Sequence, residues 1–319
     1  MKLSTVDVFK HIKRSETNIE ISDDRLAKLQ HVLFGILKDI DAACCQSGVC
    51  YTLSGGTCLG AVRHHGFIPW DDDIDLNMTH ADFDKFASAL SGMFPGKYTL
   101  QIPGKTPGYD LGFPRVRLNG TILRSREDID KPAAQCGAYV DIFYIENIPN
   151  GVVARGVHGF VSMALGFGYS CRRFAAYADQ YKKLVADDPE ALKIFKRKER
   201  IGRLFSFWSP EKWAKVWNNW NSNCKDKNSN FVSIPVGRNH YFKETYQRSV
   251  FFPVSQGDFE TLRACLPADP VTYMTKLYGS DYMTPPPEES REVHVVYEFD
   301  LGEFGEQDFN NNDKKDANK

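Results

Sequence analysis

Apolar residues first recur at helical spacing between residues 22 and 48. The repeat consists of Leu26, Leu29, Leu33, Ile36, Leu37 and Ile40. This spacing places them on one face of a helix. Ser22 is a suitable N-cap, and the acidic pair Asp23 and Asp24 favours the positive start of a helix. Gly48 is typical of a helix end. The segment therefore predicts a long amphipathic helix.

Shorter apolar runs follow and predict strands. The candidates are VCYTLSG (49–55), DDIDLNM (72–78), KYTLQIPG (97–104), FPRVRLNGTILRS (113–125) and GAYVDIFYIENIP (137–149). Short helical patterns lie at 57–63 and 80–94. Because a helix precedes a run of strands, we expect an α+β fold with a central, partly antiparallel mixed sheet and flanking helices.

The segment 151–230 has a different character. Its apolar stretch GVVARGVHGFVSMALGFGY (151–169) contains Arg155 and His158. A helix that spans a membrane needs about twenty nearly uncharged residues, so we do not expect one here. A buried hairpin and a helix on a membrane surface are the two alternatives. The stretch 193–208 is basic and amphipathic, and SPEKWAKVWNNW (209–220) predicts a helix that begins after Ser209.

Charge is unevenly distributed along the chain. The formal net charge of -1 argues against a dedicated nucleic-acid-binding protein. Residues 151–230, however, contain 15 Lys and Arg against 7 Asp and Glu. This local excess predicts an anionic partner, either a membrane surface or a phosphate-bearing substrate.

The cysteines and the N-terminal residues indicate a reducing compartment. The eight cysteines form no C-x-x-C pair, so a zinc ribbon or a thioredoxin-like motif is not expected. Residues 1–16 contain no apolar core of the kind that a secretory signal carries. We therefore expect free thiols and a cytoplasmic location.

The candidate chemistry is concentrated in SGGTCLGAVRHHGFIPWDDDIDLNM, residues 54–78. On a strand, Asp71, Asp73 and Asp75 would point to one face, because side chains alternate. Carboxylates at i and i+2 can share a divalent cation, and hard oxygen ligands suit Mg²⁺ or Mn²⁺. Asp141, among apolar strand residues, offers a third carboxylate, since a lone buried Asp is costly unless it is paired or binds metal.

The Gly55–Gly56 turn precedes these aspartates. Glycines leave backbone N–H groups open and a helix start adds partial positive charge, so the turn can bind a phosphate. A glycine turn, an Asp-apolar-Asp strand and a later strand aspartate, in this order, match the nucleotidyltransferase pattern, which implies two-metal phosphoryl chemistry. The alternative is a solvated acidic turn with salt bridges to Arg63 and His64.

The same block resembles the signature of the LicD family, G-T-x-L-G-x-x-R-x-x-x-x-I-P-W-D-D-D-x-D. VDIF (140–143) and the C-terminal pattern LYG-x-DYM-x-x-PP-x-x-x-R-x-x-H, which ends at residue 294, also resemble that family. The correspondence is weak over 151–230. We expect a nucleotidyltransferase-like catalytic core with its N-terminal helix over 1–150. A helical insertion at 151–230 would be a lid that faces the acceptor or a membrane. The core would continue at 231–302, and 303–319 would be a disordered tail.

The resemblance also implies roles for individual residues. Asp73 and Asp75 would be the metal pair, with Asp141 as the third carboxylate; these three would be catalytic. Asp71 would be an additional metal ligand. The implied donor-binding residues are Gly55, Gly56, Thr57, Arg63, Arg291 and His294. For Arg63 a structural ion pair with the aspartates is the alternative, and Arg115 and Arg117 are expected to be salt-bridged strand residues.

The activity that the resemblance implies is Mg²⁺-dependent transfer of a phospho-alcohol, phosphocholine above all, from a CDP-linked donor such as CDP-choline. The acceptor would be a hydroxyl of a cell-surface glycan, a lipopolysaccharide or teichoic acid, or its lipid-linked precursor. Peripheral contact with the inner face of the cytoplasmic membrane is a further expectation; nucleic acid is not an expected partner.

Three alternatives to this activity are open. They are a nucleotidyltransferase that moves a nucleoside monophosphate to a small molecule, a metal-dependent sugar transferase with a D-x-D motif, and a non-catalytic glycan- or metal-binding module. Choline would require an aromatic cage. The aromatic residues available for one include Trp70, Tyr109, Tyr139 and Trp208.

Overall fold

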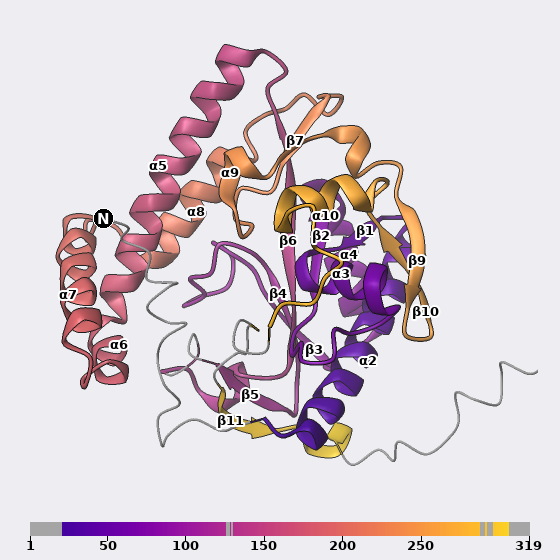
Figure 1. Cartoon of the computed structure of the whole chain (residues 1–319), viewed down its shortest axis with the longest axis horizontal. Helices are drawn as coiled ribbons and strands as arrows, with labels where there is room; N and C mark the ends of the chain where they lie inside the picture. Colours follow the sequence, from indigo (N-terminus) through magenta and orange to yellow (C-terminus); the bar gives the residue numbers. More distant parts are fainter. Residues whose placement is uncertain (1–20, 126–127, 129, 288–290, 292–295, 306–319) are drawn as a thin grey trace, which may run out of the picture. The chain divides into compact units, whose positions relative to one another are not determined.

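The computed structural model describes residues 21–125, 128, 130–287, 291 and 296–305 (Figure 1). The chain divides into two compact units. The first unit contains Gln101–Pro114 and Tyr144–Arg248. The second contains Arg115–Phe143 and the described residues of 21–100 and 249–305. Each unit is thus assembled from segments that are separate in the sequence.

Helices of the second unit are α2 (Asp23–Ser47), α3 (Gly55–His64), α4 (His80–Met93) and α10 (Pro270–Tyr278). The long helix predicted from the apolar repeat is confirmed as α2. The Ser22 side chain accepts a hydrogen bond from the Arg25 N–H, and Gly48 ends the helix with φ of 64°. The repeat is buried from Leu29 to Ile40, and α2 packs against α4 (Figure 1).

The main sheet has the strand order β1-β2-β6-β4-β3; most of these strands belong to the second unit, and β6 from Tyr144 on and Gln101 of β3 belong to the first. Its strands are β1 (Tyr51–Leu53), β2 (Asp75–Thr79), β3 (Tyr98–Gln101), β4 (Arg115–Leu118) and β6 (Tyr139–Ile148). The pairs β1–β2 and β4–β6 are antiparallel. These strands and helices confirm the predicted α+β class.

Smaller elements complete the second unit. Strand β5 (Ile122–Ser125) pairs with β11 (Val296–Asp300), and β9 (Ser255–Phe259) pairs with β10 (Leu262–Leu266). The 3₁₀ helices are η2 (Ala133–Gln135), η3 (Arg248–Val250) and η5 (Gly302–Gly305). The expected tail therefore begins inside η5, and its residues 306–319 lie outside the described residues.

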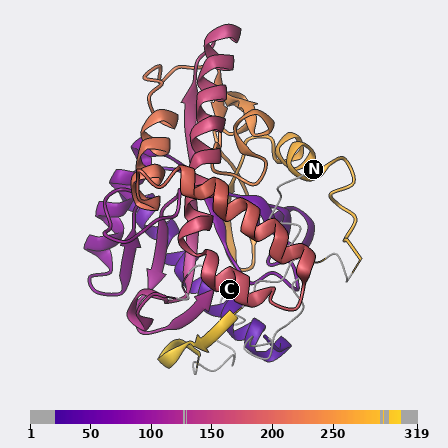
Figure 2. The ribbon, with the colours of Figure 1, turned by 90° about the vertical axis from the view of Figure 1, so that its left-hand side faces the viewer.

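The first unit is mostly helical (Figure 2). Its helices are α5 (Val152–Ala176), α6 (Ala178–Leu184), α7 (Pro189–Leu204), α8 (Pro210–Asn221) and α9 (His240–Lys243). Strand β7 (Phe231–Ser233) pairs with the end of β6 and with β8 (Thr245–Gln247). The stretch 151–169 is thus helical, so the hairpin alternative was wrong. Ser209 caps α8 as predicted.

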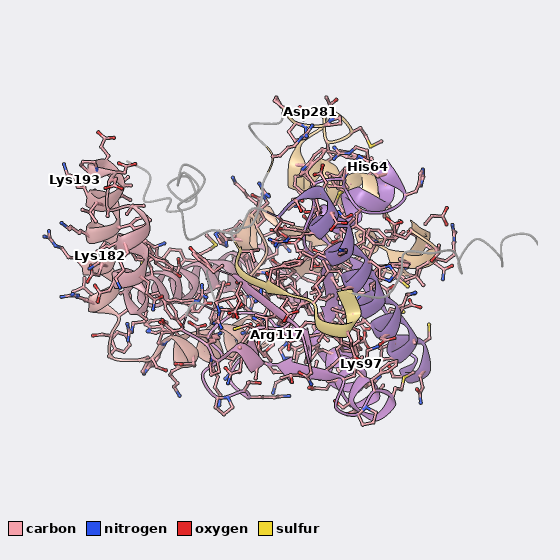
Figure 3. The ribbon with its side chains drawn as sticks, turned by 90° about the horizontal axis from the view of Figure 1, so that it is seen from below. His64, Lys97, Arg117, Lys182, Lys193 and Asp281 are labelled. Carbon is pink, nitrogen blue, oxygen red and sulfur yellow. The ribbon has the colours of Figure 1, made fainter. Side chains whose placement is uncertain are left out.

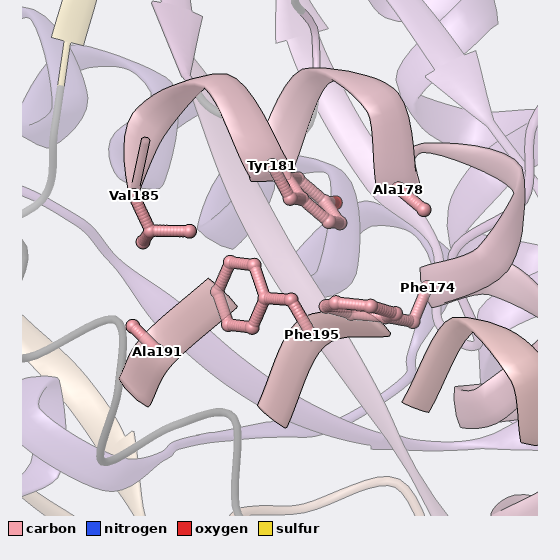
Figure 4. Packing of buried hydrophobic residues seen from close by; sticks show 6 residues of the cluster. All are labelled: Phe174, Ala178, Tyr181, Val185, Ala191 and Phe195. Carbon is pink, nitrogen blue, oxygen red and sulfur yellow. The ribbon is translucent and has the colours of Figure 1, made fainter. Parts of the chain in front are cut away.

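Helices α5, α6 and α7 share a small apolar core (Figure 4). It consists of Phe174, Ala178, Tyr181, Val185, Ala191 and Phe195. The Phe174 and Phe195 rings pack edge to face with centroids 5.1 Å apart. A Cβ at Gly202 would collide with the Cys171 carbonyl oxygen, so glycine allows α7 to approach α5 closely. No helix within the described residues has the length and apolar character needed to cross a membrane.

Candidate functional site

The glycine turn forms the start of α3. Gly55 has φ of 47°, in the left-handed region that favours glycine. Ser54 is the N-cap residue, yet its side chain makes no cap hydrogen bond. Its Oγ shares a hydrogen bond of 3.0 Å with Tyr273 Oη, which also accepts from the Gly55 N–H at 3.3 Å. The start of α3 therefore presents backbone N–H groups and partial positive charge without a side-chain cap.

Two carboxylates border this turn. A Cβ on Gly56 would lie 2.7 Å from Asp71 Oδ2, and a Cβ on Gly55 would lie 3.4 Å from Asp75 Oδ2. Both carboxylates thus occupy space that a side chain at the turn would need. The structure brings together the Gly-Gly turn and two of the four candidate aspartates, Asp71 and Asp75.

The backbone at Asp71 forms a turn and not the predicted strand. Strand β2 begins only at Asp75, so Asp71 and Asp73 do not lie on a strand and the expected alternation was wrong. The Asp71 N–H instead donates to the Ile68 carbonyl at 2.9 Å, which closes a turn. Gln30 Nε2 donates to the Asp71 carbonyl oxygen at 2.8 Å. Asp73, which lies between Asp71 and Asp75 in the sequence, is half-buried.

Asp141 has a different environment on β6. It lies opposite Arg115 in the β4–β6 ladder. Arg115 Nε donates to Asp141 Oδ1 at 2.6 Å, and a second guanidinium nitrogen donates to Oδ2 at 2.8 Å. The guanidinium also stacks on Tyr139, 3.5 Å from the ring centroid. Arg117 forms a similar buried pair with Asp128 at 2.8 Å. The expectation that both arginines are salt-bridged is confirmed.

The fit of a divalent cation can be judged from these contacts. Within the part of the chain that the structure describes, no group of three or more His, Cys, Asp or Glu side chains is arranged to hold a metal ion. Mg²⁺, however, is usually bound by one or two protein carboxylates, with water and substrate phosphates as the other ligands. Asp71 and Asp75, which border a turn suited to phosphate, fit that mode. The metal itself stays a prediction.

The candidate donor-binding residues lie in different environments. The Thr57 hydroxyl is buried and accepts from the Asp75 N–H at 2.9 Å, so it fixes the start of β2. Arg63 donates to the Tyr282 carbonyl oxygen at 2.9 Å. Partial burial lowers the pKa of the Arg63 guanidinium, while Tyr278 and Asp71 act in the opposite direction.

Arg291 lies over an aromatic ring next to the aspartates. Its guanidinium carbon is 4.0 Å from the ring centroid of Trp70, the residue before Asp71. A cation at this distance from a Trp face is favourable. His294 lies outside the described residues.

Tyr273 is a residue of the site that the sequence did not predict. It is fully buried in α10, and its hydroxyl meets Ser54, Gly55 and the Asn77 side chain. The available signal was its position one helical turn before the LYG motif at Leu277. That position alone does not show that the hydroxyl reaches a residue 219 positions away.

Comparison with known proteins adds to this geometry. Residues 48–106 match the family described as "LicD/FKTN/FKRP, nucleotidyltransferase domain". Over 279 residues, 86% of this chain and 97% of the relative, the chain is 24% identical to the lipopolysaccharide cholinephosphotransferase LicD of Haemophilus influenzae. Uncharacterized proteins of Rickettsia typhi and Rickettsia prowazekii match at 40% over 58 residues and 42% over 50. These two matches cover 18% and 16% of this chain, and 19% of each relative.

The family match covers the Gly-Gly turn and the aspartate block, which are the parts of the chain that form the candidate site. The matches, together with the α+β fold, support a phosphotransferase of the LicD type. Residues 48–106 match the nucleotidyltransferase domain of the LicD family, and the full-length similarity to a LicD protein extends well beyond them.

Proposed function

We propose that this chain transfers phosphocholine from a CDP-linked donor to a hydroxyl of a cell-surface glycan, or of its lipid-linked precursor, with the help of Mg²⁺ or Mn²⁺. The observation that supports this proposal most strongly is the placement of the Asp71 and Asp75 carboxylates against Gly56 and Gly55 at the start of α3. A turn that binds phosphate and carboxylates that bind a cation are both needed for a diphosphate donor. The similarity to the Haemophilus cholinephosphotransferase supports the choice of phosphocholine.

Each part of the site has a role in this proposal. The N–H groups at the start of α3 bind oxygens of the donor phosphates, and Arg63 pairs with a phosphate from the other end of the helix. Asp75, with Asp71 and Asp73, would hold the divalent cation. When bound, that cation supplies positive charge that offsets the charge of the diphosphate and of the leaving group.

Asp141 is the proposed proton acceptor. Arg115 donates one hydrogen bond to each of its two oxygens, and these bonds hold the carboxylate in a fixed orientation. The acceptor oxygen forms a bond to the phosphorus of phosphocholine while its proton passes to Asp141. The bond from that phosphorus to the bridging oxygen breaks, and CMP leaves with the electron pair. Arg115 is then a positioning residue, because it fixes the orientation of the Asp141 carboxylate.

Trp70 is the proposed recognition residue for choline. The Arg291 guanidinium over its ring shows that this face accepts a cation. A trimethylammonium group would use the same attraction to the ring. Tyr139 is less suitable, because the guanidinium on its ring belongs to Arg115, which is fully buried and ion-paired with Asp141, whereas Arg291 is half-buried.

A thermal-shift panel tests the donor class. The purified protein is compared with CDP-choline, CDP-ribitol, CDP-glycerol, UDP-sugars and ATP, each with and without Mg²⁺. The panel is repeated with Asp75→Asn and with a matched control, Asp84→Asn, which changes an exposed aspartate on α4. The proposal predicts stabilisation by CDP-choline that needs Mg²⁺, is lost in Asp75→Asn and is kept in Asp84→Asn.

The other outcomes of the panel identify the alternatives. Stabilisation by ATP in place of CDP-choline would favour transfer of a nucleoside monophosphate. Stabilisation by a UDP-sugar would favour the sugar transferase. An absence of binding in every metal condition would favour a glycan-binding module.

A further inference from the structure

Helix α5 exposes a continuous apolar surface. Its large exposed side chains are Val152, Val153, Val157, Phe160, Met163 and Phe167, here called the α5 apolar face. Val153 is 81% exposed and Phe160 is 71% exposed. The other exposed positions between 152 and 167 are Ala and Gly only. The outer face of a solvated helix carries charged and polar side chains, so the composition of this face is unlike that of a solvent-exposed helix.

The apolar surface continues at the end of α7. Leu204 is 75% exposed and Phe207 is 64% exposed. The Phe205 ring between them contacts Phe167 of α5, with centroids 6.1 Å apart. Both helices belong to the first unit. The exposed apolar side chains of α5 and of the end of α7 are therefore neighbours on one unit.

A basic surface leads up to this apolar one. Lys193, Lys196, Arg197, Arg200 and Arg203 are exposed, and their spacing places them on one side of α7, here called the α7 basic face. Leu204 lies on the same side of the helix, because its position continues this spacing. In all, α7 carries six Lys and Arg against two Glu. Figure 3 shows Lys193 and Lys182 at the outer edge of the unit.

Acidic side chains are fewer than basic ones on these two helices. Helix α5 contains no Asp or Glu. In α7, Glu199 is buried and is paired with Lys182 at 3.0 Å and with Arg203 at 2.6 Å. The combined surface is therefore apolar at one end and cationic at the other.

We propose that the α5 apolar face and the α7 basic face together dock on a bilayer surface that contains anionic lipids. An apolar helix face beside Lys and Arg is the pattern of a helix that lies in the membrane interface, with its apolar side chains at the boundary between headgroups and acyl chains. The basic side chains would pair with lipid phosphates. A second copy fits less well, because a symmetric pairing of this surface would bring two basic faces together. The inference rests on the first unit alone and holds whichever donor the enzyme uses.

Vesicle sedimentation tests the proposal. The purified full chain is mixed with vesicles of phosphatidylcholine alone or of phosphatidylcholine with phosphatidylglycerol. Two multiple variants disrupt the surface: Phe160→Glu with Phe167→Glu, and Lys193→Glu with Lys196→Glu and Arg200→Glu. The control is Val271→Glu, which adds one negative charge at an exposed apolar position of α10.

We expect at least about tenfold stronger binding to the anionic vesicles than to the neutral ones, with a decrease at high salt. Both multiple variants should lose this binding, and Val271→Glu should keep it. Equal binding to both kinds of vesicle, or no binding by the wild-type chain, would overturn the proposal. So would sedimentation equilibrium that shows a dimer disrupted by Phe160→Glu with Phe167→Glu, because the surface would then be covered by a second copy.

A measurement on the wild-type chain guards against misfolded variants. Brominated phosphatidylglycerol quenches nearby tryptophans, and Trp208 and Trp213 both contact Phe207. Docking predicts quenching by brominated anionic vesicles. Unchanged fluorescence would contradict the proposal, whatever the variants do.

Discussion

Asp141 is a buried carboxylate that forms an ion pair with Arg115. Arg115 is itself fully buried and donates to both carboxylate oxygens. A buried charge that loses its partner is strongly destabilising, whereas an exposed ion pair contributes little. Arg115 is therefore expected to determine stability as well as the geometry of the site.

The first residue-scale prediction concerns this pair. Arg115→Met should lower the free energy of unfolding by roughly 3–5 kcal/mol, because it leaves Asp141 buried without its cation. Arg263→Met, which breaks the exposed pair with Asp258, should change it by less than about 1 kcal/mol. Urea unfolding measures both values. Equal stability of the two variants would contradict the assigned role of Arg115.

The second residue-scale prediction concerns Gly56. A Cβ there would lie 2.7 Å from Asp71 Oδ2, so Gly56→Ala should displace that carboxylate. Misplacement of a group in the site can reduce activity by roughly 10²-fold. The control is Gly92→Ala in α4, where a Cβ meets nothing within 4 Å. It should raise stability by about 0.5–1 kcal/mol and leave activity unchanged. Initial rates of transfer measured for both variants test this prediction. Similar rates for Gly56→Ala and Gly92→Ala would show that the turn is outside the site.

At the scale of elements, α10 positions the start of α3. Tyr273 contacts the N-cap residue and the first N–H of α3, and Asn77 on β2. One hydroxyl thus joins a helix start to the strand that begins at Asp75. Local sequence gives no sign of this contact, because it joins segments far apart in the chain.

Tyr273→Phe should weaken donor binding. Loss of the hydroxyl leaves buried polar groups with fewer partners, at a cost of about 1–3 kcal/mol in unfolding free energy. Tyr98→Phe, which removes a 2.7 Å hydrogen bond to Asp39, is the control of similar chemistry. Both variants should be less stable, but only Tyr273→Phe should raise the KM for the donor. An unchanged KM would limit Tyr273 to a structural role.

Helix α5 carries a buried histidine that should make stability depend on pH. Burial lowers the pKa of His158, which stacks on Trp220 and hydrogen-bonds to Tyr241 Oη at 2.9 Å. Near pH 6 and below, the unfolded chain binds a proton that folded His158 does not, because the unfolded pKa is about 6.5. The unfolding free energy should therefore fall as the pH drops through about 6.5.

Chemical unfolding between about pH 8 and pH 5 measures this effect. His158→Phe cannot take up the proton and should show a smaller loss of stability on acidification than the wild-type chain. His240, whose pKa is also lowered by burial, contributes to the remaining change in both proteins. Parallel pH profiles for the two proteins would show that His158 is protonated in the folded state as well.

At the scale of the whole molecule, the spacing of residues along the sequence predicted helices and strands. It did not predict the contacts between residues that are far apart in the chain. Helix α2 and its cap at Ser22 could be predicted because apolar spacing and capping act within a few residues. The turn at Asp71 could not, since it depends on the Ile68 carbonyl and on Gln30 from α2. The pairing of Asp141 with Arg115 follows from the β4–β6 register, which only the folded sheet defines.

The candidate site was predictable to a similar degree. The sequence predicted that the Gly-Gly turn and the aspartates lie together, and Asp71 and Asp75 do border that turn. Their use as metal ligands and the roles of Asp73 and Asp141 stay predictions. The division into a core, an insertion at 151–230 and a tail also stays a prediction.

The most direct test of the account is transfer itself. The purified chain is incubated with CDP-choline, Mg²⁺ and a lipopolysaccharide acceptor that lacks phosphocholine, and mass spectrometry detects the mass of phosphocholine on the glycan together with free CMP. Both products are expected with the wild-type chain and with Asp84→Asn, and Asp75→Asn should lose roughly 10²-fold or more of the transfer rate. Equal transfer by Asp75→Asn and the wild-type chain would contradict the site assigned to the glycine turn and its carboxylates.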